Sequence, residues 1–382
     1  MSQDVSSSVE MNRIAQDFQR DVWCLLGLPV DNLTMEGAKQ LLREKTKLPY
    51  NTVLSTINVN WVVQSFSDPA FHSAIINSDI VVLDGKPLLW LAKLLGYPMT
   101  ETVAGSTLIQ ELHQDKTTDD KLTIFLFGGE DDTAEKAAKE INKNPGGLSA
   151  VGFLNPGFGT VDEISSDAII DAINRTKPDI LLVALGAKKG MQWIEQNRER
   201  LDAKIISHLG ATINFLAGTV QRAPLIVRRI GMEWAWRILQ EPKLFSRYAT
   251  DGFVLLRVLL SRFWLWRQFL SSQKRLNHKA GESIVIQHEN DDEIVLSCGR
   301  NLILTPASPL RKLFVRCVHS KKKIKIDLQR SEFADGAFFA LLLILLKHQR
   351  NNVAQLDVTN VMSNIDKLLT LFCVKDNIQI KQ

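Results

Sequence analysis

Short apolar runs alternate with amphipathic stretches between about residues 50 and 215. The runs are rich in β-branched and large aliphatic residues, which is typical of strands buried on both faces of a sheet. Helical patterns follow most of these runs, and strands that alternate with helices predict a mostly parallel sheet with helices on both faces. The predicted strands cover residues 52–59, 79–83, 122–127, 150–153, 179–185 and 203–208.

The last hundred residues show the same alternation on a smaller scale and predict a second, smaller α/β domain. Its predicted strands are 283–287 and 293–297, which form a hairpin, then 323–328, 355–358 and 377–380, with helices over 338–348 and 363–372. The chain is therefore of the α/β class. We divide it into a mobile lead-in (1–20), a larger α/β core (21–220), a helical appendage (221–271), a linker (272–282) and the small domain (283–382).

The composition is that of an ordinary globular protein, since 45% of the 382 residues are hydrophobic and 23% are charged. The four cysteines show no CxxC spacing, which favours reduced cytoplasmic thiols over disulfides or metal ligands. Seven scattered histidines form no metal-binding pattern. The first thirty residues lack a long apolar core, and no uncharged apolar run reaches the length of a membrane span. Neither a signal peptide nor a transmembrane helix is expected.

Positive charge is concentrated in the helical appendage. Residues 221–275 hold eleven Lys or Arg against three acids, together with four of the eight tryptophans. Basic residues mixed with Trp and Leu are typical of a helix that lies in a membrane interface, with its apolar side in the headgroup boundary. The apolar groove of a partner would suit the same pattern, and a helical hairpin docked on the sheet and a subunit interface are the structural alternatives. Nucleic acid is a weaker option, because no nucleic-acid-binding motif accompanies the charge.

Asp84 stands at the end of a predicted buried strand, immediately before a predicted helix that runs from Pro87 to Gly96. Ligands of open α/β sheets bind at the carboxyl ends of the strands. A carboxylate in that place can take a proton from a hydroxyl nucleophile. The alternative is structural, with Asp84 capping the helix and Gly85 making the turn.

Two other polar residues occupy an equivalent position in the first strand of the predicted sheet. If residues 52–59 form one strand, Thr56 and Asn58 point to the same side, because side chains alternate with period two. Both could orient a sugar hydroxyl or amide near Asp84. The alternative is a polar strand edge without a role in binding.

Glycine-containing turns follow two further strands. Gly128-Gly129 stands between a strand and a helix, where backbone N–H groups could meet an anion such as a diphosphate. Leu185-Gly186-Ala187-Lys188-Lys189-Gly190 follows the most apolar strand and could also receive phosphate. A plain turn with solvated lysines is the alternative at this second place.

Further motifs follow along the chain. They are Val103-Ala104-Gly105-Ser106, Trp193-Ile194, residues 218–224 (Gly-Thr-Val-Gln-Arg-Ala-Pro), Gly231-Met232-Glu233-Trp234, and the stretch from Arg237 to Glu241-Pro242. Together with Thr56-Ile57-Asn58, Val82-Leu83-Asp84-Gly85, Leu89-Trp90, Phe127-Gly128-Gly129 and Leu185-Gly186-Ala187, this ordered set resembles the WecG/TagA/CpsF glycosyltransferases. The resemblance covers roughly residues 22–255.

The resemblance implies an inverting transfer that needs no metal or other cofactor, on a Rossmann-like sheet. An N-acetylmannosamine-type sugar would move from a UDP donor to a polyprenyl-diphosphate-linked sugar, in the synthesis of a cell-surface polysaccharide. Asp84 matches the proposed general base, and Thr56 and Asn58 match residues that hold the sugar or acceptor. The residues expected to bind the substrate or nucleotide are Gly105, Gly128, Gly129, Gly186, Gln192, Asn214, Arg222, Arg237 and Arg247.

The resemblance also implies a place in the cell. The basic appendage would seat the protein on the inner face of the cell membrane through residues 243–271, with the rest of the chain in the cytoplasm. It would close over the active site, and Arg237 and Arg247 would meet the diphosphate. No nucleic-acid partner is implied.

The chain departs from the family pattern at a few positions. The family's glutamine after the Leu-Gly-Ala turn is Gly190 here, although Gln192 lies two residues further on. The family's acid near the uracil is Asn214 here, and its acid after Ala-Gly-Ser is either replaced by Thr107 or absent. These changes motivate an alternative function, a catalytically weak scaffold that binds a nucleotide or lipid and recruits a partner.

The small C-terminal domain resembles STAS domains, which are non-catalytic interaction modules. The resemblance rests on Ile324-Lys325-Ile326-Asp327-Leu328, on Phe333-Ala334-Asp335-Gly336-Ala337 and on Leu356-Asp357-Val358. It implies a protein partner for this domain. Related anti-sigma antagonists carry a phosphorylatable Ser where this chain has Gly336, so no phosphorylation switch is expected at that position.

Overall fold

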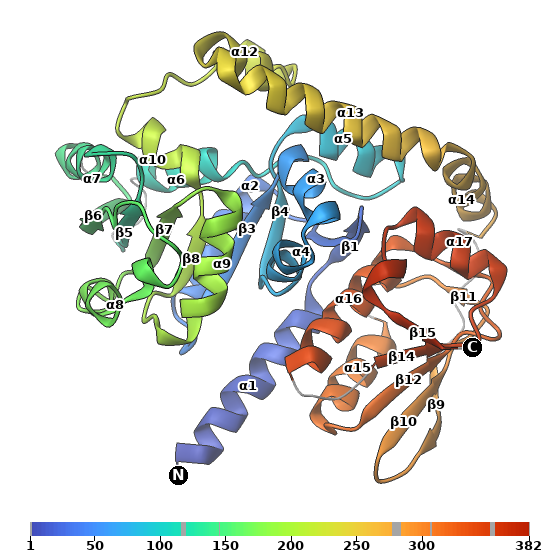
Figure 1. The fold of residues 1–382 in the computed structure, drawn as a ribbon. Coiled ribbons are helices and arrows are strands. Elements are labelled where there is room, and N and C mark those ends of the chain that lie inside the picture. The colour runs from blue at the N-terminus through green and yellow to red at the C-terminus, as the bar shows by residue number, and fades with distance from the viewer. Residues whose placement is uncertain are drawn as a thin grey trace. The chain divides into compact units, whose positions relative to one another are not determined.

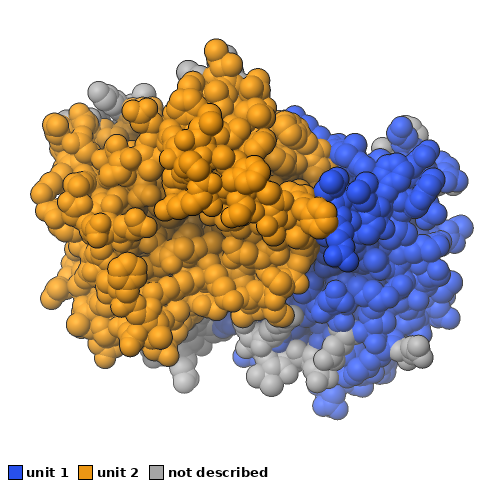
Figure 2. All heavy atoms as spheres, turned by 45° about the horizontal axis from the view of Figure 1, so that its top comes forward, with its two compact units in different colours: residues 1–32, 92–98, 256–382 blue, residues 33–91, 99–255 orange. Residues whose placement is uncertain are grey.

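The computed structural model describes residues 2–115, 120–144, 146–276, 284–305, 308–351 and 356–381. The chain forms two compact units, which are coloured separately in Figure 2. Unit 2 comprises residues 33–91 and 99–255, and unit 1 comprises residues 1–32, 92–98 and 256–382. Residues 21–32 and 92–98, which the sequence placed in the larger core, thus fall into the unit that holds the C-terminal domain.

Unit 2 is built on a six-stranded sheet in which every strand pair is parallel, which confirms the predicted fold class. Its strand order is β4-β3-β8-β7-β5-β6 (Figure 1). The strands are β3 (Thr52–Ile57), β4 (Ile80–Leu83), β5 (Leu122–Gly128), β6 (Leu148–Leu154), β7 (Ile180–Ala184) and β8 (Ile205–His208). Most of these strands are buried on both faces, which explains their continuous apolar character.

Helices cover both faces of this sheet. On one face, alternate strand residues such as Leu54, Val82 and Leu182 pack against apolar residues of four helices. These are α2 (Met35–Lys45), α6 (Gly105–Gln114), α7 (Thr133–Lys143) and α10 (Gly210–Leu216). The opposite strand residues meet α3 (Val59–Ser67) and α9 (Ala187–Asn197), as in the contact between Phe127 and Trp193, and α4 (Pro69–Ile76) contacts both of these helices. The remaining helices of this part are α5 (Lys86–Leu94) after β4, and α8 (Asp167–Asn174) before β7.

The first strand of the sheet is shorter than its sequence suggested. Strand β3 ends at Ile57, and Asn58 is the N-cap of α3 because its side chain accepts a hydrogen bond from the Trp61 N–H at 3.2 Å. A polar residue after an apolar run fits both a strand end and a helix cap. The prediction of one strand over residues 52–59 was therefore wrong at its last two positions.

The appendage is helical, as its composition suggested. It contains α11 (Leu225–Arg229), α12 (Glu233–Gln240), α13 (Phe245–Ser261) and α14 (Phe263–Leu276), with a short 3-10 helix, η3 (Pro242–Leu244), between α12 and α13. Helix α14 includes the first five residues of the predicted linker, and residues 277–282 lie outside the described part of the chain. Within the ranges that the structure describes, no helix is both long and apolar enough to cross a membrane.

Unit 1 holds a five-stranded sheet with the order β15-β14-β12-β10-β9. Strands β9 (Val285–Glu289) and β10 (Glu293–Ser297) form the predicted antiparallel hairpin, and the other neighbours are parallel. Helix α15 (Pro309–His319) was not predicted, although its buried residues recur with helical spacing. The other elements are β11 (Asn301–Leu302), β12 (Lys323–Asp327), β13 (Phe333–Ala334), α16 (Gly336–Asn351), β14 (Leu356–Thr359), α17 (Ser363–Leu371), η4 (Lys375–Asn377) and β15 (Gln379–Lys381).

The N-terminal segment differs from the expected mobile lead-in. Residues 2–19 form helix α1 (Ser2–Gln19), which contacts α15 and α16, and strands β1 (Val22–Leu25) and β2 (Leu28–Asp31) follow it. Phe18 is fully buried, and its ring lies 5.8 Å from that of Phe314. Helix α16 is apolar on all sides and contacts α1, α15, β1 and β2, so these elements cover it.

A buried cluster of charges joins α1 to α16. Asp17 lies 2.7 Å from the Lys347 ammonium, 3.0 Å from His348 Nε2 and 2.9 Å from the Arg20 guanidinium. Burial acts to raise the pKa of Asp17, but these neighbours together hold it well below its usual value. A buried carboxylate with such partners is costly to disrupt, because removing it leaves a buried cation without its counter-charge.

Candidate active site

The carboxyl ends of β3 and β4 place Thr56 and Asp84 at the same edge of the sheet. The two strands are neighbours in parallel register, with Thr56 opposite Val82 and Ile57 opposite Leu83. Asp84 directly follows β4, and its N–H donates to the Ile57 carbonyl at 2.7 Å. The chain then turns at Gly85, whose φ of 108° requires glycine, and enters α5.

The side chain of Asp84 is not used as a helix cap. Among the described residues, no hydrogen bond or ion pair of its carboxylate is found, and only burial and nearby charges act on it. Asp84 is half-buried. Burial and, to a lesser degree, the nearby Glu233 carboxylate raise its pKa to about 7, although Arg237 and Arg222 act in the opposite direction. A base is most effective when its pKa lies near the working pH.

Thr56 lies beneath the start of helix α6. It is buried, and a Cβ atom at Gly105 would lie 3.2 Å from its Oγ1 and 2.2 Å from Leu209 Cδ2. Gly105 therefore allows α6 to approach the ends of β3 and β8. Asn58 uses its Oδ1 to cap α3, so its Nδ2 group is the part of the side chain that can still donate to a ligand.

Arg222 is fixed on the first turns of α6. Its guanidinium donates to Ser106 Oγ and Thr107 Oγ1, each at 2.8 Å, and also to Gln110 Oε1. It stacks over Phe215, with 5.4 Å from Cζ to the ring centroid. Its Nε is buried without a hydrogen-bond partner among the described residues. Thr107, one of the departures from the family pattern, thus helps to position a cation close enough to act on Asp84.

Gly231 brings the appendage to the start of α5. Its φ is 76°, and a Cβ atom there would lie 2.9 Å from Lys86 Cβ and 3.2 Å from the Trp90 ring. This tight turn between α11 and α12 places Glu233 and Arg237 where both charges act on Asp84. Sequence reasoning noted Glu233 within a motif but gave it no role, because its effect depends on this long-range contact.

The other arginine expected at the site has a different environment. Arg247 lies on α13, is exposed, and stacks on Tyr248 at 5.2 Å. Its charge acts on Asp251, which is hydrogen-bonded to Asn60 Nδ2 at 3.0 Å. Arg237 pairs loosely with Glu241 at 3.5 Å, and its Nε is buried without a hydrogen-bond partner in the described part of the chain. The structure thus brings Arg237 to Asp84, but it gives Arg247 no such contact.

The two glycine turns serve close packing in different degrees. Gly128 has a φ of 95°, and a Cβ atom there would lie 2.5 Å from the Ala184 carbonyl oxygen. The Gly129 N–H donates to that same oxygen at 2.9 Å, so this N–H is already used. Gly186, with a φ of 80°, begins α9, and the space around its Cβ position is open. Gly186 is therefore better placed than Gly129 to approach a ligand.

Gly190 makes room for a buried histidine that sequence reasoning missed. A Cβ atom at Gly190 would lie 2.1 Å from His208 Cδ2, so the imidazole occupies the space that a side chain would need. Burial lowers the pKa of His208 to about 4, so its ring is neutral at neutral pH. Gln192 is half-buried on α9, and Asn214 is half-buried on α10. Among the described residues, no group of His, Cys, Asp or Glu is arranged as metal ligands would be.

The chain is similar in sequence to known enzymes. A relative from Bacillus spizizenii, an N-acetylglucosaminyldiphosphoundecaprenol N-acetyl-beta-D-mannosaminyltransferase, is 25% identical over 206 residues, which are 53% of this chain and 78% of that protein. A relative of the same name from Staphylococcus aureus is 24% identical over 227 residues, which are 58% of this chain and 86% of that protein. The family model described as "Glycosyl transferase WecG/TagA/CpsF family" matches residues 23–268. The chain therefore belongs to the WecG/TagA/CpsF family of glycosyl transferases.

Proposed function

We propose that the protein transfers an N-acetylmannosamine-type sugar from a UDP donor to a sugar carried on a polyprenyl diphosphate, with inversion at the anomeric carbon. The observation that carries this proposal is Asp84, whose carboxylate follows β4 at the carboxyl edge of the sheet and has a pKa of about 7. The names of the relatives support the choice of sugar and acceptor, since both act on N-acetylglucosaminyl-diphosphoundecaprenol. The product would be part of a cell-surface polysaccharide.

Asp84 acts as the general base in this proposal. Its carboxylate takes the proton of the acceptor hydroxyl while the hydroxyl oxygen bonds to the anomeric carbon of the donor sugar. The bond from that carbon to the diphosphate oxygen breaks, and UDP leaves with the electron pair. Thr56 and Asn58, at the end of the neighbouring strand, hold the reacting sugar, which contributes through positioning.

Cationic side chains bear the charge of the leaving diphosphate. Arg222 and Arg237 both act on Asp84, and each has a buried Nε that lacks a hydrogen-bond partner in the described structure. A diphosphate oxygen would satisfy such an N–H group with a strong, charge-assisted hydrogen bond. The open turn at Gly186 offers a second approach for the nucleotide end of the donor.

The protein would work on the inner face of the cell membrane, where its acceptor lies. Helix α13 exposes Phe253, Leu256 and Leu260 at helical spacing, and α14 begins with exposed Phe263 and Trp264. Arginines such as Arg257 accompany these apolar residues. Such a helix binds an anionic surface by placing its apolar side among the acyl chains and its cations at the lipid phosphates.

Release of UDP tests the transfer. Wild-type protein is mixed with UDP-N-acetylmannosamine and a lipid-linked N-acetylglucosamine acceptor, and UDP is measured over time. The Asp84→Asn variant should bind UDP normally but lose roughly 10²–10⁴-fold in turnover, which is the usual contribution of general base catalysis. Asp202→Asn, which changes an exposed carboxyl in the same unit, is the matched control and should keep full activity.

Two results would contradict the proposal. Full turnover by the Asp84→Asn variant would show that Asp84 is not the general base. A wild-type protein that binds UDP but releases none from a broad panel of UDP-sugars would favour the non-catalytic scaffold, in which the C-terminal domain recruits a partner.

A further inference from the structure

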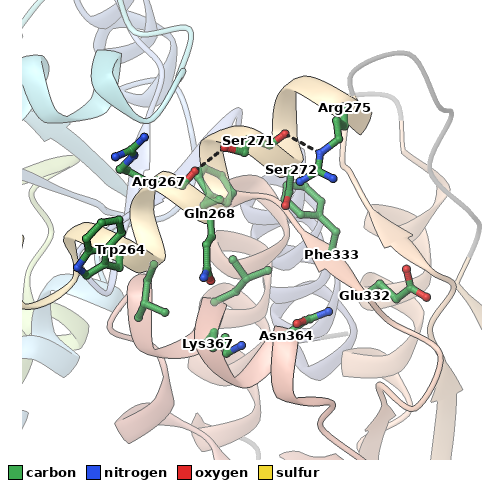
Figure 3. Close-up of a pocket in the computed structure, with 13 residues that line it drawn as sticks. Trp264, Arg267, Gln268, Ser271, Ser272, Arg275, Glu332, Phe333, Asn364 and Lys367 are labelled. Atoms are coloured by element: carbon green, nitrogen blue, oxygen red, sulfur yellow. Dashed lines mark hydrogen bonds between the residues drawn. The ribbon is translucent and has the colours of Figure 1, made fainter.

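A pocket of about 610 Å³ lies within unit 1, between helix α14, strand β13 and helix α17 (Figure 3). Its volume falls in the range of small-molecule sites, which is ~300–1,000 Å³. None of the residues discussed for sugar transfer lines it. It therefore needs an explanation of its own.

The floor of this pocket is apolar. Phe269 and Phe333 are buried and stack with their ring centroids 5.6 Å apart, and Leu368 lies beside them in the lining. Trp264 stands at one end of the pocket and is 71% exposed. The guanidinium of Arg267 stacks over its indole at 5.7 Å, which keeps a cation at the same end.

The walls are polar and carry positive charge. Ser272 and Arg275 come from α14, and Asn364 and Lys367 come from α17 across the pocket (Figure 3). Neither Arg275 nor Lys367 has a carboxylate partner within the described ranges of the chain. The one acid in the lining, Glu332, is paired with Arg300 at 2.8 Å. The pocket thus combines uncompensated cations, hydroxyl and amide groups, and an apolar floor.

We propose that this pocket binds the head group of an anionic membrane phospholipid. The phosphate would lie between Arg275 and Lys367, where charge-assisted hydrogen bonds are available, and the serine and amide groups would meet the glycerol oxygens. The acyl chain would cross the apolar floor and leave past Trp264. Phe263, which is 42% exposed, contacts Trp264 with their ring centroids 5.7 Å apart and adds apolar surface at that end of the pocket.

This occupant fits the pocket better than a water-soluble phosphate ester does. A soluble ester would use the cations but would leave the exposed indole of Trp264 in contact with water, which is unfavourable. The proposal goes further than attachment of α13 and α14 to a membrane surface. It assigns one bound lipid to a defined site, and a dissolved lipid can test it because such a lipid offers no surface.

The test uses the full chain and dihexanoyl phosphatidylglycerol, kept below its micelle concentration and titrated calorimetrically. We expect saturable binding to one site. The triple variant R267Q/R275Q/K367Q should bind at least about tenfold more weakly, because it loses the charged hydrogen-bond donors. The matched control removes three exposed cations of the same unit that do not line the pocket, as K312Q/K321Q/R330Q, and should bind as the wild type does.

A second variant fills the pocket without changing its charge. Asn364 is exposed on the first turn of α17, and Asn364→Trp should block the lipid while circular dichroism stays unchanged. The proposal is overturned if the control triple loses as much affinity as the pocket triple. It is also overturned if dihexanoyl phosphatidylcholine, inorganic phosphate or an acidic peptide binds as tightly as the anionic lipid. UDP release by the same variants, measured with a soluble acceptor, reports separately on the transfer reaction.

Discussion

The hydroxyl of Tyr97 lies so close to Gly336 that a Cβ atom at position 336 would be 2.2 Å from the Tyr97 oxygen. Tyr97 is buried and donates to the Cys24 carbonyl at 2.6 Å, so it cannot swing away freely. From the sequence, Gly336 was notable only because related anti-sigma antagonists carry a phosphorylatable serine at this position. In the structure, it is the position at which the segment 92–98 packs on the start of α16 within unit 1.

Gly336→Ala should therefore destabilise unit 1. An alanine within a helix normally stabilises it by up to ~1 kcal/mol relative to glycine. The overpacking against Tyr97 should reverse that sign and cost about 1–3 kcal/mol. Urea denaturation measures the change in the free energy of unfolding, and hydrogen exchange of the α16 amides shows whether the change affects unit 1. In a Tyr97→Leu background, which removes the crowding atoms, the same substitution should cost less. Equal costs in both backgrounds would refute the steric explanation.

Glu233→Gln should shift the pH profile of transfer. Glu233 helps to raise the pKa of Asp84, so its removal lowers that pKa below about 7. Because the base must be deprotonated, the acidic limb of kcat/KM should move to lower pH, with a plateau lowered a few-fold by the weaker base. Arg237→Gln is the paired variant of opposite sign, since Arg237 lowers the pKa of Asp84 and its loss should move the limb to higher pH. Profiles that shift in the same direction would show that Asp84 is not the titrating group.

Asp17→Asn should lower the free energy of unfolding of unit 1 by about 3–5 kcal/mol, because the buried Lys347 would lose the carboxylate that lies 2.7 Å from its ammonium. The pKa of Asp17 is lowered in the folded chain, so its contribution is present above its unfolded value near 3.8 and is lost as the pH falls below that value. The wild type should thus lose its advantage over the variant in acid. Glu10→Gln, at an exposed acid of the same helix, should change the unfolding free energy by less than ~0.5 kcal/mol.

Replacing Leu256 and Leu260 by serine should weaken membrane binding. These residues are 53% and 64% exposed on α13, so the fold should tolerate the change. Burying a leucine side chain contributes ~1.5–3 kcal/mol, and losing two should reduce sedimentation with phosphatidylglycerol vesicles by at least roughly tenfold. The control is Phe153→Ser with Phe158→Ser, which removes two exposed aromatics near strand β6. Equal losses in both double variants would argue against an interfacial role for α13.

The sequence was sufficient where the signal is local. Asp84 follows a four-residue apolar strand and precedes a helix, and both patterns can be read without tertiary contacts. Asn58 was misplaced because a cap and a strand end share the same polar signal. Helix α15 was not predicted, although its buried residues recur at the 3.6-residue period of a helix, so the sequence does carry the signal for it.

Other features depend on contacts between distant parts of the chain. The role of Glu233 follows from the turn at Gly231, which rests on Lys86 and Trp90. The N-terminal helix packs through Phe18 on Phe314 and through the charges around Asp17, and the sequence of a polar segment does not show such distant partners. The packing role of His208 follows only from the structure, in which its ring occupies the space that a side chain at position 190 would need.

Unit 1 is built from three separate segments of the chain, residues 1–32, 92–98 and 256–382, and this has a consequence for the order of folding. Asp17 is synthesised early, but its partner Lys347 follows 330 residues later. At ~5–20 residues per second, on the order of half a minute passes on the ribosome before the two can meet. During that interval the sheet of unit 2 can close, whereas Phe18 and strands β1 and β2 must wait for α16. Nascent chains halted before residue 336 should therefore hold a folded unit 2 beside an N-terminus that proteases can still cut.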